Sequence, residues 1–158
     1  MRLGVAVVLV VGLLFGGTAW ASPTRELALL RADGVRVEFE VEVASSEAQR
    51  REGLMARASL PPRHGMLFDF RGPTVATMWM KDTSLSLDML FLDEQGRVVW
   101  IAADTTPGSL ALISASQPVR YVLELRGGET RALGIAVGDR ALLPFRTRAP
   151  AAARRPGP

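Results

Sequence analysis

Apolar and charged residues alternate most strictly between residues 35 and 43. Valine or phenylalanine occupies every odd position, and arginine or glutamate occupies every even position. This period of two is typical of a strand with one buried face. The preceding Asp33-Gly34 pair predicts a two-residue type I′ turn, because both residue types tolerate positive φ. Its register gives three pairs on one face: Ala32 with Val35, Leu30 with Val37, and Ala28 with Phe39. The pattern therefore predicts a β-hairpin over residues 27–43.

A short helix is predicted over residues 46–52. Ser46 is a suitable N-cap, and Gln49 three residues later completes a capping box. Glu47 in the first turn complements the helix dipole. Gly53 is a natural stop, so this helix is expected to end there.

Six further apolar runs follow, at residues 66–70, 75–80, 87–92, 98–102, 121–125 and 141–145. Turn-forming residues separate them, and residues 104–118 read as a long loop. With the hairpin they give about eight short strands and one short helix, without a βαβ rhythm. This composition of elements predicts a mainly β fold, a small antiparallel-to-mixed barrel or rolled sheet.

The chain opens with a segment typical of export. Arg2 precedes an almost wholly apolar run at residues 3–15, and Ala19-Trp20-Ala21 has the small residues that a signal peptidase needs. We expect residues 1–21 to be a cleaved signal peptide and the mature protein to be periplasmic or secreted, without a transmembrane segment. An uncleaved membrane anchor is the alternative, because Trp20 suits a membrane interface. Residues 22–145 are then a single β-rich domain, followed by a disordered Arg/Pro/Ala tail at 146–158.

Composition removes several classes of function. The chain has no cysteine, which excludes thiol catalysis, iron–sulfur clusters and thiolate metal sites and leaves the fold to its core alone. The sequence pI of 10.5 is misleading. Five of the 19 basic residues lie outside 22–145, which leaves 14 basic against 16 acidic residues in the domain. A nucleic-acid partner is therefore not predicted.

Polar residues inside apolar runs mark the candidate site. Asp88 is the second residue of the run 87–92, and Glu124 lies within 121–125. A buried carboxylate needs a partner, and Lys81 or Arg57 could supply it. The structural alternative is that Asp88 accepts backbone N–H bonds and fastens the 81–86 connection.

The functional interpretation is a shallow polar pocket. Trp79 would be a stacking wall, Lys81 a cation, and Thr83 and Asp88 hydrogen-bonding groups; Asp82, Arg57 and Glu124 complete the candidate ligand-binding set. Such a pocket suits a small polar ligand, carbohydrates included. No nucleophile–base pair accompanies it, so no catalytic residue and no cofactor is predicted.

Two other functions remain open. A Cu(I) site could form from Met78, Met80, His64 and Met66, because soft thioether ligands suit Cu(I); methionine as core filler is the alternative. An envelope-protein interaction module could use a sheet edge or the 104–118 loop. An exposed patch at Leu110, Leu112 and Ile113 would favour that module. The sequence does not indicate an oligomeric state.

An ordered set of motifs resembles the family catalogued as domain of unknown function 192. In chain order it comprises Gly53-Leu54-Met55, Arg57, Leu60, Gly65-Met66-Leu67-Phe68, Trp79-Met80-Lys81, Thr83, Leu87-Asp88, Phe91, Tyr121-Val122-Leu123-Glu124-Leu125, Gly127 or Gly128, and Gly138-Asp139. The resemblance spans residues 36–144 and implies a small β-rich domain, often exported, without an established activity. Asp82 stands where the family usually has asparagine, and Leu85-Ser86 replaces Ile-Pro. Since a carboxylate lacks the two amide donors, ligand binding is expected to differ here.

Overall fold

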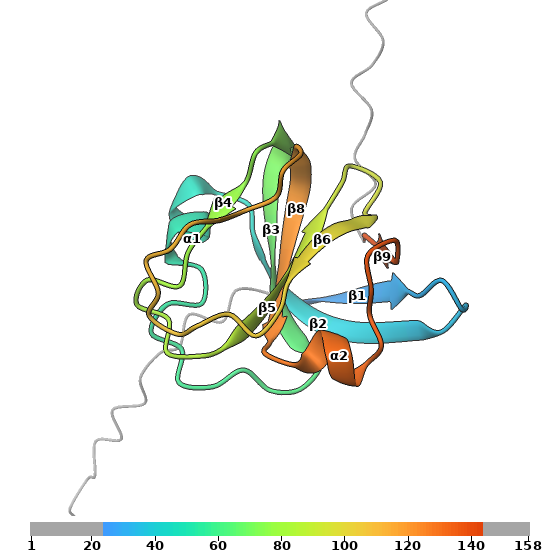
Figure 1. Cartoon of the computed structure of the whole chain (residues 1–158), viewed down its shortest axis with the longest axis horizontal. Coiled ribbons are helices and arrows are strands. Elements are labelled where there is room, and N and C mark those ends of the chain that lie inside the picture. The colour runs from blue at the N-terminus through green and yellow to red at the C-terminus, as the bar shows by residue number, and fades with distance from the viewer. Residues whose placement is uncertain (1–23, 144–158) are drawn as a thin grey trace, which may run out of the picture.

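Seven strands hydrogen-bond into one curled sheet in the computed structural model, which describes residues 24–143 (Figure 1). Along the sheet the order is β6 (Val98–Ala102), β5 (Leu87–Leu92), β8 (Val119–Arg126), β3 (His64–Thr74), β2 (Arg36–Ala44), β1 (Thr24–Leu30) and β9 (Arg140–Leu142). Only β2 and β3 pair in parallel. A separate ribbon joins β4 (Thr77–Met78) to β7 (Ile113–Ser114), and the two described helices are α1 (Glu47–Glu52) and α2 (Glu129–Ala132).

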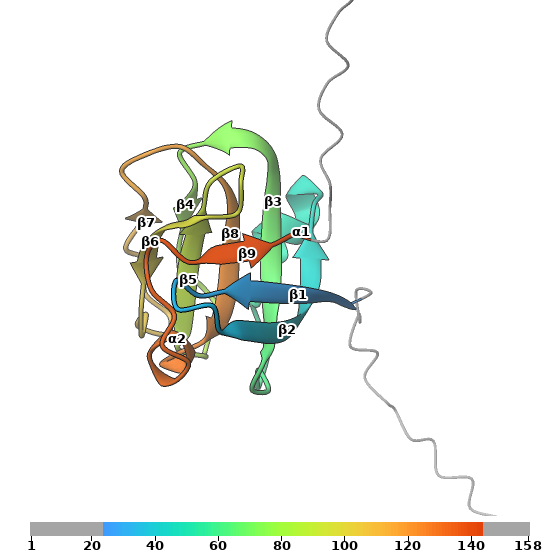
Figure 2. The same cartoon turned by 90° about the vertical axis from the view of Figure 1, so that its right-hand side faces the viewer.

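The two edges of the sheet meet, which makes the fold barrel-like. Val98 N–H donates to the Asp139 carbonyl and Ala141 N–H donates to the Gly96 carbonyl, both at 2.8 Å. Figure 2 shows β1, β2 and β9 crossing over β3 and β8 as the sheet curls round. The predicted mainly β fold, a small barrel or rolled sheet, is confirmed.

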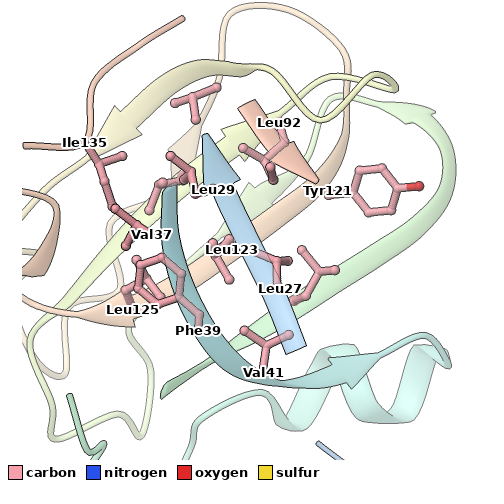
Figure 3. Packing of buried hydrophobic residues seen from close by; sticks show 14 residues of the cluster. Leu27, Leu29, Val37, Phe39, Val41, Leu92, Tyr121, Leu123, Leu125 and Ile135 are labelled. Carbon is pink, nitrogen blue, oxygen red and sulfur yellow. The ribbon is translucent and has the colours of Figure 1, made fainter. Parts of the chain in front are cut away.

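The sheet separates two hydrophobic clusters. The inner cluster fills the barrel with apolar side chains from β1, β2, β3, β5, β6, β8 and β9, including Leu27, Leu29, Val37, Phe39 and Leu123 (Figure 3). The outer cluster lies on the opposite face of β3, β5 and β8, beneath α1, the 53–60 loop and the β4–β7 ribbon. Apart from Asp88 and Glu124, strands β5 and β8 are therefore apolar on both faces, as their apolar runs predict.

Local sequence rules predict α1 well. Gln49 N–H donates to Ser46 Oγ at 3.2 Å, and Ser46 N–H donates to Gln49 Oε1 at 3.0 Å. The capping box is confirmed, and the helix ends before Gly53.

The predicted hairpin forms, but its predicted register is wrong by one residue. Leu29 pairs with Val37 and Leu27 with Phe39, so the leucines of β1 face the inner cluster. The reason is the turn: Gly34 takes positive φ and Asp33 does not, so a longer loop replaces the type I′ turn. A one-residue slip moves every side chain of a strand to the other face.

Other elements differ in extent. Of the run 75–80 only Thr77–Met78 pairs as a strand, although the predicted alternation is confirmed: Ala76, Met78 and Met80 are buried. The sequence did not predict α2 or β7. The last strand covers Arg140–Leu142.

The predicted signal peptide and tail lie outside the described residues. Within residues 24–143, no helix has the length and apolar character that a membrane crossing requires.

Candidate functional site

Glu124 stands in the outer cluster, surrounded by methionines. It lies opposite Met66 of β3 and Met89 of β5 in the strand ladders. Directly opposed residues of antiparallel strands project their side chains to the same face, with Cβ atoms about 5 Å apart. The carboxyl group of Glu124 is therefore flanked by a thioether side chain on each side.

The Glu124 carboxyl group has no partner within the described part of the chain. The residue is 4% exposed. Burial in these apolar surroundings raises its pKa to about 8, and no hydrogen bond or ion pair opposes the shift. Below that pH the group is a neutral acid, a state that avoids the large cost of burying an unpaired charge.

A small cavity opens beside this carboxyl group, and we call it the Glu124 chamber. Its volume is about 30 Å³, enough for one or two water molecules or a single ion. Glu124, Thr83, Trp79, Met78, Phe68 and Met55 line it together with residues 50–54. Lys81 Nζ lies 5.5 Å from the Trp79 ring centroid, within range of a cation–π contact. The structure thus brings Trp79, Thr83 and Glu124 together, with Lys81 beside the Trp79 ring.

A larger recess, the α1 cleft, lies between α1, the end of β2 and the loop that follows α1. It has a volume of about 380 Å³. Glu42, Gln49, Glu52 and Arg57 contribute its polar groups, and Met66 contributes to its apolar lining. Arg57 Nη2 donates to Glu42 Oε2 at 2.8 Å in a partly buried ion pair. Glu52 and Gly53 line both the cleft and the chamber, so the end of α1 is their common wall.

Asp88 lies elsewhere, on the inner-facing side of β5, and its bonds go to backbone and to Thr130. It accepts from the N–H groups of Asp104, Gly128 and Thr130 at 2.8 to 3.0 Å, and from Thr130 Oγ1 at 2.6 Å. Burial alone would raise the pKa of Asp88, but these hydrogen bonds outweigh it and hold the pKa below its usual value. The structure does not bring Asp88 into the chamber; the carboxylate fixes the start of α2 and the 104 loop.

Asp82 occupies the tip of the turn between β4 and β5. It is exposed with φ of 54°, and its carbonyl oxygen accepts from Ala56 N–H at 3.1 Å. Ser84 Oγ donates to the Arg57 carbonyl at 3.4 Å. These bonds join the turn to the loop after α1, which is how residues distant in sequence come to surround the chamber.

The predicted Cu(I) set is divided, because its three methionines lie in the outer cluster and His64 does not. Met66, Met78 and Met80 belong to the outer cluster, and Met80 Sδ accepts from Thr105 Oγ1 at 3.2 Å. His64 instead contacts the Glu40 carboxylate at 3.4 Å and the Pro62 carbonyl at 3.0 Å. Within residues 24–143 no three His, Asp or Glu side chains are grouped as metal ligands.

The sequence did not indicate the α1 cleft or the role of Met55. Both depend on how α1 and its following loop lie against the sheet, and neither leaves a periodic pattern. Glu124, by contrast, was predicted as a site residue, because it is the sole charged residue inside the run 121–125.

Several exposed apolar side chains precede or follow β4 and β7 in the chain. Leu110 and Leu112 are 68% and 70% exposed, and Val75 and Trp79 are exposed as well. Ile113 is only partly buried against the outer cluster. Of the three residues in the predicted patch, Leu110 and Leu112 are therefore exposed and Ile113 is partly buried.

Comparison with known proteins gives a family and two similar structures. The family model DUF192, described as an uncharacterized ACR, matches residues 28–143. A proposed transcription regulator from Sinorhizobium meliloti 1021 is 42% identical, with a TM-score of 0.75, covering 76% of this chain and 93% of its own. A protein of unknown function from Novosphingobium aromaticivorans DSM 12444 is 34% identical, with a TM-score of 0.73 and coverages of 76% and 85%. The search of curated proteins gave no match.

Proposed function

The chain belongs to the uncharacterized family DUF192, and from that premise we propose that it binds a small polar ligand in the α1 cleft. The observation that carries the proposal is the cleft itself, about 380 Å³ in volume with an ion pair between Arg57 and Glu42 on its wall. Small-molecule sites are commonly concavities of about 300 to 1,000 Å³ with a few convergent polar groups.

Size favours the cleft over the chamber for such a ligand. A chamber of about 30 Å³ cannot admit a sugar ring. The cleft can, and Arg57, Glu42 and Glu52 offer both donors and acceptors to hydroxyl groups. Arg57 is thus the member of the predicted ligand set that would contact the ligand, while Trp79, Thr83 and Glu124 lie behind the common wall.

The proposal does not extend the Sinorhizobium description to this chain. Recognition of DNA by charge needs a basic surface, whereas residues 22–145 carry 14 basic and 16 acidic residues. The apolar start of the chain supports export, and a ligand of the bacterial envelope would be consistent with that location. Cell-wall saccharides are the first class to test.

The test is a thermal-shift screen of the full chain against glucose, galactose, N-acetylglucosamine and muramyl dipeptide. A ligand that binds only the folded state stabilises it by about 2.7 kcal/mol at a hundredfold excess over Kd. We expect one saccharide to raise Tm, and R57A to abolish the rise.

R36A is the matched control, because Arg36 forms an ion pair with Glu38 on the same strand in full solvent. It should leave the ligand-induced rise unchanged. A rise that survives R57A, or no rise with any saccharide, would refute the proposal and direct attention to a protein partner for the Leu110–Leu112 patch.

A further inference from the structure

We propose that the Glu124 chamber binds one soft monovalent cation, Cu(I) or Ag(I), through methionine thioethers and the Glu124 carboxylate. This inference is independent of the ligand proposed for the α1 cleft. It rests on three observations: a partnerless buried acid, a concentration of thioethers around it, and a cavity of matching size.

The first observation is the isolation of Glu124. Its side chain lines the chamber, is more than nine-tenths buried, and makes no hydrogen bond or ion pair with any described residue. A leucine at this position would complete the apolar outer cluster at no electrostatic cost. A cation in the chamber would displace the proton that Glu124 carries below about pH 8 and release it to solvent, and it would give the resulting carboxylate the partner it lacks.

The second observation is the thioethers. Met66 and Met89 flank Glu124 in the strand ladders, and Met55 and Met78 line the chamber. Four of the five methionines between residues 24 and 143 therefore either lie opposite Glu124 in the strand ladders or line the same chamber. Thioether sulfur is a soft ligand that prefers Cu(I)-like ions to hard cations such as Ca²⁺ or Mg²⁺. In a chain without cysteine it is the only soft sulfur ligand present.

The third observation is size and aromatic lining. A volume of about 30 Å³ accommodates a single ion and excludes organic molecules. Trp79 lines the same cavity, and the π-face of an indole attracts cations. Phe68 and Met78 of the outer cluster form the apolar part of the lining, and Arg50, Arg51 and Glu52 line the chamber as well.

This ligand set differs from the one that the sequence suggested. Met78 and Met66 remain close to the site. His64 is turned to Glu40 and Pro62, and Met80 Sδ already accepts a hydrogen bond from Thr105. Met55, Met89 and Glu124 take their place. Met80 is a ligand in the set that the sequence suggested and is not a ligand in the chamber set, so substitution of Met80 distinguishes the two.

The test is calorimetric titration of the full chain with silver nitrate in chloride-free buffer, since Ag(I) has the softness of Cu(I) without its redox chemistry. We expect one equivalent to bind tightly. M78L and E124Q should each weaken binding about tenfold or more, in line with the loss of a metal ligand. M80L should bind like the wild type.

M55L guards against misfolding, because Met55 is only partly buried and a methionine-to-leucine change conserves volume. If M78L fails to fold, M55L decides the question by the same tenfold criterion. Wild-type affinity in E124Q, or an equal loss in M80L and M78L, would overturn the proposal and identify the binding as adventitious capture of silver by thioethers.

Discussion

At the residue scale, two buried carboxylates on the adjacent strands β5 and β8 have opposite surroundings. Asp88 accepts four hydrogen bonds, and its pKa is lowered; Glu124 accepts none, and its pKa is raised to about 8. The sequence marks both equally, as single acids in apolar runs. They differ because the loop at residue 104 and the start of α2 pack beside Asp88 and donate hydrogen bonds to it. No local sequence pattern predicts this packing. The sequence can therefore select unusual residues, but not decide which is structural.

The burial of Glu124 makes stability depend on pH in a defined direction. Its pKa is about 8 when folded and 4.5 in the reference state, so between these values the folded chain binds more protons than the unfolded chain. The contribution of Glu124 to stability then falls as pH rises from 5 to 8. E124Q cannot ionise, so its stability relative to the wild type should increase by roughly 3 kcal/mol over that interval.

Urea unfolding of both chains at pH 5, 6, 7 and 8 measures this difference. E94Q is the control, because Glu94 is exposed in a turn and its substitution should not alter the pH slope. Parallel stability profiles for E124Q and the wild type would show that Glu124 ionises normally. A stabilising substitution that also removes Ag(I) binding would follow the usual trade-off between stability and function.

At the scale of elements, local and distant interactions differ sharply in predictability. Helix α1 follows from its own capping box, and the bounds of β5 and β6 follow from their apolar runs. The register of β1, by contrast, depends on which turn residues take positive φ, and the run 27–32 was compatible with either face. Helix α2 has no side-chain cap of its own and relies on Asp88 from β5. The two-residue strand β7 exists only through its pairing with β4.

The barrel seam is an element whose strength can be measured through Gly96. Its φ is +79°, and a Cβ atom there would lie 2.4 Å from the backbone carbonyl oxygen of Ala141 in β9. G96A should therefore strain the backbone and force β9 away from residues 96–98. We expect a loss of about 2 to 4 kcal/mol in the free energy of unfolding.

Gly34 gives a matched control for G96A, because its φ of +84° is nearly the same but a Cβ atom would meet nothing within 4 Å. G34A should cost only the backbone term, about 1 to 2 kcal/mol. The difference between the two variants, measured by urea unfolding, isolates the steric contribution of the seam. Equal losses would mean that β9 tolerates displacement and contributes little to closure.

At the scale of the whole molecule, both hydrophobic clusters are built on the same strands. Alternate residues of β3, β5 and β8 enter the inner and the outer cluster: Leu123 faces inwards, and Val122 faces outwards. If these shared strands separate, the side chains of both clusters become exposed to solvent. The proposed sites lie on the outer cluster, so they are held by the barrel although they are not part of its interior.

This shared construction predicts that the molecule unfolds in one cooperative step. Trp79 lies at the chamber, and Trp100 contacts Phe91 of the outer cluster in a tilted arrangement, with ring centroids 4.8 Å apart. In a W20F background their fluorescence reports the outer layer, while far-ultraviolet circular dichroism reports the sheet. The two urea transitions should coincide, because small domains with one continuous set of strands unfold in an all-or-none manner.

A fluorescence transition at lower urea would mean that α1 and the β4–β7 ribbon detach first. The chamber and the cleft would then open without loss of the barrel, and ligand or ion binding should shift the fluorescence midpoint alone.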